Sequence, residues 1–187
     1  MSLLKEQVTQ LLKVRSSSEY SITERKLALE QLQQLDKAKI LLVLLSLVSD
    51  QNYQDSEVRY RAIEAIASLA PRGCSKLLFP FLNDPDWIVR IEVCGQLYNY
   101  GYIFHENFEE AILPLTEILR NDPEVSVRLI AAGALGKLGD KRAIPALQWS
   151  QEHDAGKDWE GRSVKHEATA AIEEILFRKK IIDDIAK

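Results

Sequence analysis

Histidine is the side chain that would most readily give this chain metal chemistry, and it is scarce. The three histidines are His105, His153 and His166. His153 precedes Asp154, and His166 follows thirteen residues later. Zinc sites use closely spaced ligands such as His-x3-His, and no pair here has that spacing. The sequence therefore predicts no metal site.

The two cysteines are equally weak as candidate nucleophiles. Cys94 lies among small residues in an expected helix, where it reads as a buried hydrophobic side chain. Cys74 lies between Gly73 and Ser75, near an expected helix start that would favour a thiolate, but no base can be assigned to it. The chain also has no glycine-rich phosphate loop and no nucleophile elbow. We therefore predict no catalytic residues and no cofactor.

A repeated acid–arginine pattern is the most distinctive feature of the sequence. Residues 83–90 read Asn-Asp-Pro-Asp-Trp-Ile-Val-Arg, and residues 121–128 read Asn-Asp-Pro-Glu-Val-Ser-Val-Arg. Each copy leads into a segment of small residues and ends near a glycine, Gly101 or Gly139. Asp84 and Asp122 are expected to cap these helices, followed by a proline in the first turn. Internal repetition of this kind indicates a repeat architecture.

The repeat extends over nearly the whole chain. Its helix recurs at Val58, Val89, Val127 and Val164, and a fainter copy begins near Glu24. Each copy follows another helical segment with apolar residues at helical spacing. These first helices are expected at residues 3–14, 37–48, 75–82, 108–119 and 143–149. The fold class is therefore all-α, one domain over residues 1–187 with five units near 1–36, 37–70, 71–101, 102–139 and 140–187.

Residues 122–140 carry a family resemblance. They read Asp-Pro-Glu-(x)2-Val-Arg-(x)2-Ala-Ala-x-Ala-Leu-Gly-x-Leu-Gly-Asp, which resembles the HEAT repeat and especially its bilin-lyase-type subset. The resemblance implies an α-α superhelix, or solenoid. Pro114 and Pro145 fall at matching places in their first helices, whereas Pro80 lies only four residues before Asp84. The kink expected in that first helix is therefore uncertain in position.

The resemblance also implies a structural ladder, in which an acid at a helix start meets an arginine of the adjoining unit. Arginine suits this role because its planar fork can bind a carboxylate and backbone carbonyls together. The alternative is that the arginines bind phosphate. The ladder residues are Arg59, Asp84, Arg90, Asp122 and Arg128.

A solenoid presents an extended concave face built from equivalent positions of successive helices. Counting about 100° per residue from Val127 places Leu129 and Gly133 on the outer side of their helix. The equivalent positions suggest an apolar, glycine-floored groove with an acidic rim at Glu30, Glu64 and Glu173. The alternative is that superhelical curvature buries some of these side chains. The predicted partner-binding residues are Tyr60, Glu64, Trp87, Ile91, Gly95, Tyr98, Leu129, Gly133 and His166.

Composition narrows the classes of partner. The formal net charge of −4 over 187 residues argues against a grip on nucleic acid, which needs a basic surface. Two cysteines are too few for a disulfide framework, so we expect a cytoplasmic location. The most apolar run, residues 40–48, is far shorter than the roughly 20 residues of a membrane-spanning helix. We expect neither secretion nor a membrane partner.

These observations favour a non-catalytic protein-binding module, acting as an adaptor, assembly factor or inhibitor. The first alternative is a bilin lyase-like subunit that acts on a chromophore-bearing protein, with bilin as a ligand. It follows only from the resemblance, and fold-level analogy is a weak guide to function. The second alternative is DNA binding, against which the acidic positions Glu30, Glu64 and Glu173 argue. The polar stretch 151–163 either touches the partner or is a plain connection.

Overall fold

The computed structural model describes residues 2–50, 55–69, 75–104, 109–138 and 140–185. Within these ranges the chain is an all-α superhelix, apart from one isolated bridge between Lys157 and Ser163. None of the helices in the described ranges is long and apolar enough to cross a membrane. The elements are α1 (Ser2–Ser16), α2 (Ile22–Gln34), α3 (Lys37–Ser49), α4 (Ser56–Leu69), α5 (Ser75–Leu78), η1 (Phe79–Asn83), α6 (Trp87–Phe104), α7 (Glu109–Asn121), α8 (Val125–Leu138), η2 (Lys141–Ala143), α9 (Ile144–His153) and α10 (Val164–Ile185).

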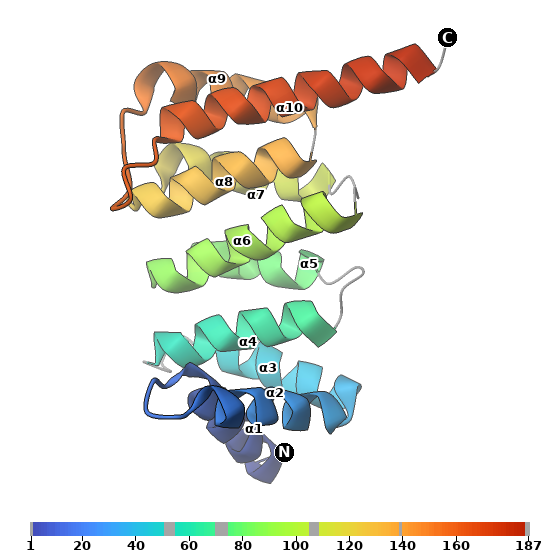
Figure 1. Cartoon of the computed structure of the whole chain (residues 1–187), viewed down its shortest axis with the longest axis vertical. Coiled ribbons are helices and arrows are strands. Elements are labelled where there is room, and N and C mark those ends of the chain that lie inside the picture. Colours follow the sequence, from blue (N-terminus) through green and yellow to red (C-terminus); the bar gives the residue numbers. More distant parts are fainter. Residues whose placement is uncertain (1, 51–54, 70–74, 105–108, 139, 186–187) are drawn as a thin grey trace.

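The helices form two layers that run the length of the molecule (Figure 1). Helices α4, α6, α8 and α10 are stacked in one layer, and α3, α5, α7 and α9 lie behind them. We call the solvent-facing side of the first layer the second-helix face. A continuous core of valine, leucine, isoleucine and alanine side chains separates the layers. Burial of this apolar surface is the main force that holds successive units together.

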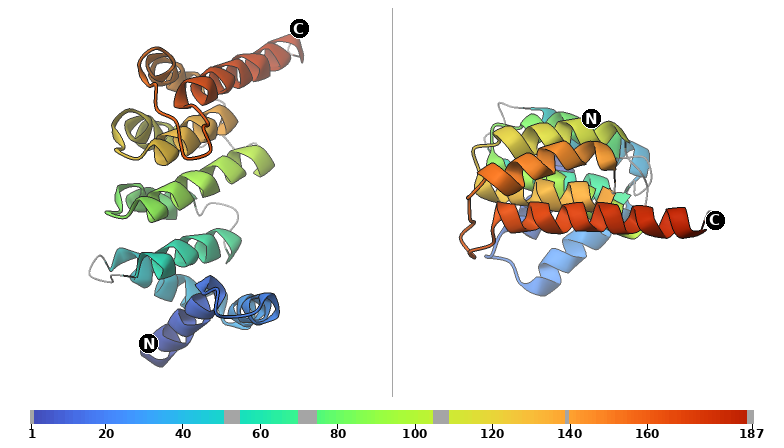
Figure 2. Two further views of the ribbon diagram at one scale, coloured as in Figure 1. Left: turned by 60° about the vertical axis from the view of Figure 1, so that its left-hand side comes forward. Right: turned by 90° about the horizontal axis from the view of Figure 1, so that it is seen from above.

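The amino-terminal unit departs from this pattern. Helix α1, not α2, packs against α4, and α2 rests chiefly on α1. Seen from above, α2 lies outside the stacked layer (Figure 2). Glu30, which lies on α2, therefore does not continue the acidic rim, and that expectation is wrong. The side chain of Arg15 on α1 takes the neighbouring place and pairs with Glu64.

Proline determines the shape of the first helix in the third unit. The segment expected as one helix over residues 75–82 is a four-residue helix, α5, followed by the 3-10 turn η1. Pro80 has no backbone N–H to donate to an α-helical hydrogen bond, and its ring clashes with the preceding turn. The short, tightened segment leaves space beside α7.

Two expected helix boundaries are also wrong. Helix α6 continues past Gly101 to Phe104, and Gly101 instead allows α8 to come close. A β-carbon on Gly101 would lie 2.8 Å from the backbone carbon of Lys137. Asp84 and Asp122 lie three residues before α6 and α8, so they do not occupy the helix caps. Gly139 is outside the described residues.

Candidate functional site

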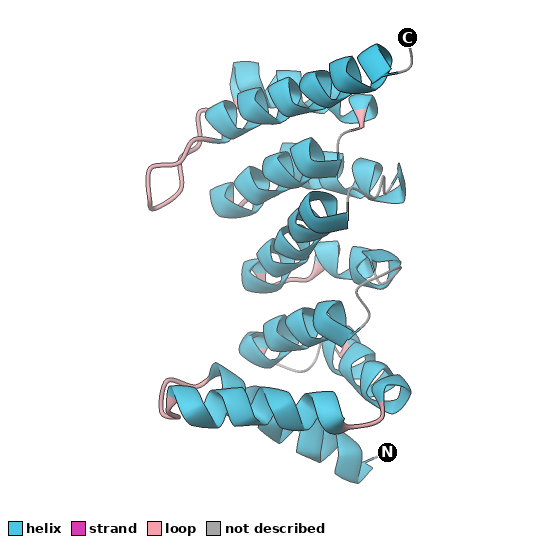
Figure 3. Ribbon diagram, turned by 45° about the vertical axis from the view of Figure 1, so that its right-hand side comes forward, coloured by secondary structure: helices cyan, strands magenta, loops and turns pink. Residues whose placement is uncertain are grey.

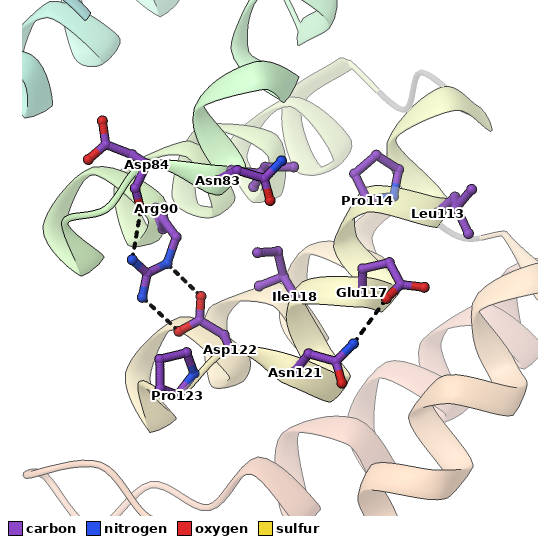
Figure 4. Close-up of a pocket in the computed structure, with 11 residues that line it drawn as sticks. Asn83, Asp84, Arg90, Leu113, Pro114, Glu117, Ile118, Asn121, Asp122 and Pro123 are labelled. Carbon is purple, nitrogen blue, oxygen red and sulfur yellow. Dashed lines mark hydrogen bonds and ion pairs between the residues drawn. The ribbon is translucent and has the colours of Figure 1, made fainter. Parts of the chain in front are cut away.

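Three bidentate ion pairs connect successive units along the edge where α6 and α8 begin. Arg90 donates from Nε and Nη2 to the Asp122 carboxylate at 2.6 and 3.0 Å, and from Nη1 to the carbonyl of Asp84 at 2.8 Å (Figure 4). Arg128 repeats this pattern, with bonds of 2.6 and 3.1 Å to its acid. The guanidinium groups of these arginines already bind carboxylates, so they are poorly suited to bind phosphate. The three pairs are Arg59–Asp84, Arg90–Asp122 and Arg128–Asp154.

Asp154 is the ladder residue that sequence reasoning missed. No Asn-Asp-Pro motif marks it, but its Oδ1 accepts the N–H of Gly156, two residues on. The Asp84 and Asp122 carboxylates accept the N–H two residues on in the same way. Burial disfavours the ionised form, yet the hydrogen bonds from Arg128 and Gly156 prevail and hold the pKa of Asp154 below its ordinary value. Only the shared turn geometry identifies it.

The weak sequence candidates for chemistry gain no support from the structure. The His153 ring stacks on Trp149 with ring centroids 5.2 Å apart. This contact is a packing contact and gives no support to a role as a metal ligand. Over the described residues, no three acidic, histidine or cysteine side chains are grouped to hold a metal ion. Cys94 is fully buried, and desolvation raises the pKa of its thiol far above the ordinary value. Cys74 and His105 lie outside the described residues.

The predicted partner-binding residues divide by exposure. Trp87 and His166 are exposed, whereas Leu129 is only 3% exposed and Gly133 is buried. The expectation of an open groove, with Leu129 standing beside a floor of Gly95 and Gly133, is therefore wrong at Leu129 and Gly133. Helix α8 is packed between α6 and α10, and its small side chains let both neighbours approach closely. The half-buried members are Tyr60, Glu64, Ile91, Gly95 and Tyr98.

The solvent-facing position of α8 lies one residue further along the helix than expected. One residue turns a helix by about 100°, so on this helix the step separates a buried side chain from a half-exposed one. On α8 the half-buried residue is Ile130 instead of Leu129. We call the equivalent half-buried positions the outer row. They are Arg61, Glu92, Ile130 and Glu167.

Gly133 supports two side chains of the neighbouring helices. A β-carbon there would lie 2.7 Å from Oε1 of Glu167 and 3.2 Å from the ring of Tyr98. The Nζ of Lys137 lies 5.6 Å from the centre of the same ring, within the range of a cation–π contact. Gly133 is therefore a platform covered by Tyr98 and Glu167.

Most charges on this face neutralise one another. Arg15 and Arg61 both bind Glu64, and Lys137 and Arg178 both bind Glu174. Each of these basic side chains is at least partly buried, so the pairs are better ordered than freely exposed ones. The second-helix face is thus a charged surface of paired residues instead of the apolar groove expected from sequence.

Glu92 and Glu167 of the outer row differ from these pairs. Oε1 of Glu92 accepts one hydrogen bond, from the Gln96 amide at 2.6 Å. In the described structure neither carboxylate forms an ion pair. Desolvation by burial raises the pKa of both carboxyls, and the nearby Glu64 and Glu174 carboxylates add to the effect at Glu92 and Glu167 respectively. Sequence reasoning missed both, although their repeat position was readable.

The loop after α9 projects from the stack (Figure 3). Asp158 holds it together: its carboxylate accepts hydrogen bonds from the backbone of Glu160 and Arg162 and from the Arg162 side chain. Gly161 has a positive φ of 81°, which glycine adopts without strain. Trp159 is 85% exposed at the tip. The stretch is therefore an ordered hairpin that displays one aromatic side chain.

Comparison with known proteins agrees with this architecture. Residues 127–153 match the family model of the PBS lyase HEAT-like repeat. No curated protein matches the sequence. A designed armadillo repeat protein in complex with the peptide (KR)4 has a TM-score of 0.54 at 23% identity, covering 90% of this chain and 81% of that chain. A computationally designed armadillo repeat protein for modular peptide recognition has a TM-score of 0.55 at 24% identity, covering 89% and 81%.

The repeat match and the helical stack together define the class. Residues 127–153 match the PBS lyase HEAT-like repeat, and the fold of the chain is an all-α superhelix similar to that of the designed armadillo repeat proteins. At these identities the solved structures bear on the fold alone.

Proposed function

We propose that this repeat module binds an extended segment of a partner protein across its second-helix face, and that the segment carries basic side chains. The observation that carries the proposal is the pair of half-buried carboxylates, Glu92 and Glu167, which form no ion pair within the described residues, on a face where Arg15, Arg61, Lys137 and Arg178 are each paired with a glutamate. They lie at equivalent positions of α6 and α10. A segment that crosses the stacked helices would meet both.

The cost of leaving these carboxylates desolvated supports the proposal. A partly buried carboxylate loses hydration without regaining it from a partner, and its pKa rises as a result. A lysine or arginine from a bound segment supplies a charge-assisted hydrogen bond at the same place. Tyr60 and Tyr98, half-buried beside the outer row, are side chains favoured as anchors in protein interfaces.

One structural neighbour supplies a basic peptide that can test this proposal directly. The designed armadillo repeat protein was solved with (KR)4, a peptide of alternating lysine and arginine. The same peptide, labelled with a fluorophore, can be titrated with this protein and followed by anisotropy. We expect saturable binding that E92Q and E167Q each weaken several-fold, and that the double variant weakens further.

The matched control is Glu110→Gln, an exposed acid on α7 in the other layer. It removes the same charge from the protein without touching the second-helix face. Equal losses in Glu110→Gln and Glu92→Gln would show that the peptide responds only to net charge, which contradicts the proposal. Failure of the wild-type protein to bind (KR)4 would contradict it as well.

The bilin-lyase alternative is supported by the repeat match alone. The matched segment supplies close-packed small residues of α8 and the ladder residue Arg128, whose contacts are structural. Adding free bilin and recording the visible absorbance spectrum tests this alternative, and a shifted band would establish binding. DNA binding fits the face less well, because Arg15, Arg61, Lys137 and Arg178 are each paired with a glutamate.

A further inference from the structure

A cavity of about 610 Å³ opens between η1 and α7, in the layer opposite the second-helix face (Figure 4). Its wall mixes apolar and polar side chains, with Pro114 and Ile118 beneath and Leu113, 69% exposed, at the rim. The ion-paired Arg90 and Asp122 also line it. Glu117 also lines it and holds the amide of Asn121. The cavity lies beside η1, the 3-10 turn that contains Pro80 and follows the four-residue helix α5. It is a recess with an apolar patch at Leu113, Pro114 and Ile118 and an acid, Glu117, beside that patch.

The carboxyl-terminal part of α10 has the complementary character. Helix α10 has 22 residues and its partner α9 has 10, so α10 runs past the stack (Figure 1). On this overhang Phe177 is 64% exposed, and Leu176 and Ile181 are also exposed. Lys180 is exposed and follows Phe177 by three residues, so both lie on one side of the helix. We call residues 176–181 the arm.

The arm cannot reach the cavity of its own molecule. Arg178 binds the backbone carbonyl of Lys137, which places the arm at the carboxyl end of α8. The cavity is lined by residues up to Pro123, next to the amino end of α8. The two sites therefore lie toward opposite ends of the helices. A contact between them has to form between two copies.

We propose that the arm of one copy docks into the cavity of a second copy, with Phe177 against Leu113 and Ile118 and Lys180 beside Glu117. Each surface alone leaves large apolar side chains in water, and mutual burial removes both exposures. The charges are complementary, since the arm carries Lys179 and Lys180 and the cavity carries Glu117, while Arg90 in the cavity wall is already paired with Asp122. This inference does not depend on the peptide-binding proposal, because neither the arm nor the cavity includes Glu92 or Glu167.

Such a contact joins two different surfaces, so it is heterologous and each added copy offers a new free arm and a new free cavity. We expect the wild-type protein to associate as its concentration rises from about 10 µM to about 1 mM, the range of a modest interface. Sedimentation velocity would show a weight-average mass that climbs above the 21.3 kDa of the single chain.

Two single variants separate the surfaces. Phe177→Asp disables the arm and Leu113→Asp disables the cavity, and both side chains are exposed, so folding is preserved. Each variant alone is expected to stay at the mass of one chain. An equimolar mixture is expected to form dimers and nothing larger, because one intact arm meets one intact cavity. Leu42→Asp, an exposed position on α3 away from both surfaces, is expected to associate like the wild type.

A charge exchange gives a second readout. Lys180→Glu and Glu117→Lys are each expected to weaken association several-fold, and the double variant K180E/E117K is expected to recover it. A wild-type mass that stays at one chain throughout would overturn the proposal. So would unchanged association of Phe177→Asp, or a mixture of Phe177→Asp and Leu113→Asp that forms no dimers.

Discussion

Arg90 and Asp122 are 32 residues apart in sequence, yet the guanidinium of one holds the carboxylate of the other through two hydrogen bonds of 2.6 and 3.0 Å. The same guanidinium also binds the carbonyl of Asp84 within its own unit. Both side chains are buried, with residue exposures of 8% and 7%. The pair therefore ties the start of α6 to the end of α7 and sets how the two units meet.

We expect Arg90→Met to destabilise the protein by about 3 kcal/mol, because it leaves the buried Asp122 carboxylate without its cation. Denaturant unfolding followed by far-UV circular dichroism measures the change. Arg142→Met removes an exposed arginine that also pairs with an aspartate, Asp140, and should leave the midpoint unchanged. An equally small effect at Arg90 would show that the ladder contributes little to stability.

Two glycines, Gly95 on α6 and Gly136 on α8, are expected to respond to alanine with opposite signs. A β-carbon at Gly95 meets nothing within 4 Å, so Gly95→Ala should stabilise the protein by about 0.5–1 kcal/mol through helix propensity. At Gly136 the β-carbon would lie 2.8 Å from the Cα of Ala171, so Gly136→Ala should cost about 1–3 kcal/mol by forcing α8 and α10 apart. Thermal unfolding of both variants measures the difference. A shared sign would contradict this packing.

Leu129 and Ile91 occupy equivalent repeat positions but differ in burial. Leu129→Asp places a carboxylate among core side chains and should reduce helix content or abolish folding at 37 °C. Ile91 is half-buried, so Ile91→Asp should lose less stability and keep the helical spectrum. Circular dichroism and urea titration compare them. A well-folded Leu129→Asp variant would mean that α8 is more open than its contacts indicate.

Binding of (KR)4 should depend on pH through Glu92 and Glu167. Both carboxyl pKa values are raised in the free protein, and a cationic ligand favours the ionised form. Binding therefore releases protons, and affinity should fall as the pH drops from 7 towards the ordinary glutamate value of about 4.3. Anisotropy titrations at several pH values measure this dependence.

Other charged groups lie near these two carboxyls, so the measurement needs a control. Arg61, Arg15 and Glu64 act on Glu92, and Lys137, Arg162 and Glu174 act on Glu167. E92Q/E167Q should bind more weakly at pH 7 and lose most of the pH dependence. Full retention of that dependence in the double variant would assign it to other carboxyls.

The helices themselves were largely readable from sequence. The expected first helices at residues 37–48 and 108–119 agree with α3 (Lys37–Ser49) and α7 (Glu109–Asn121) to within a few residues. Apolar periodicity is a local property, and it survives folding because each helix buries one side. The effect of Pro80 could not be predicted from the sequence, because its place in the repeat left the position of the kink open. Only the structure shows that α5 ends at Leu78 and that the 3-10 turn η1 follows.

The candidate site was less readable for a physical reason. The half-buried side of a helix shifts by about 100° for each residue, so an error of one position exchanged Leu129 for Ile130 and passed over Glu92 and Glu167. Leu129 is buried because α6 and α10 both pack closely against α8. The sequence of α8 does not show this packing, because it depends on helices distant in sequence. Asp154 escaped notice for the same kind of reason, because its role depends on a turn instead of a motif.

The sequence alone predicted the all-α repeat, its acid–arginine spacing and its lack of catalytic motifs. All of these follow from residue types at short separations. Tertiary structure decided which arginine meets which acid, which side of each second helix faces solvent, and where α2 lies. Those outcomes depend on how closely helices approach and which charges then find partners. Glu92 and Glu167 could be identified only from the structure, which shows that they are half-buried and form no ion pair within the described residues, whereas Glu64 and Glu174 nearby are paired.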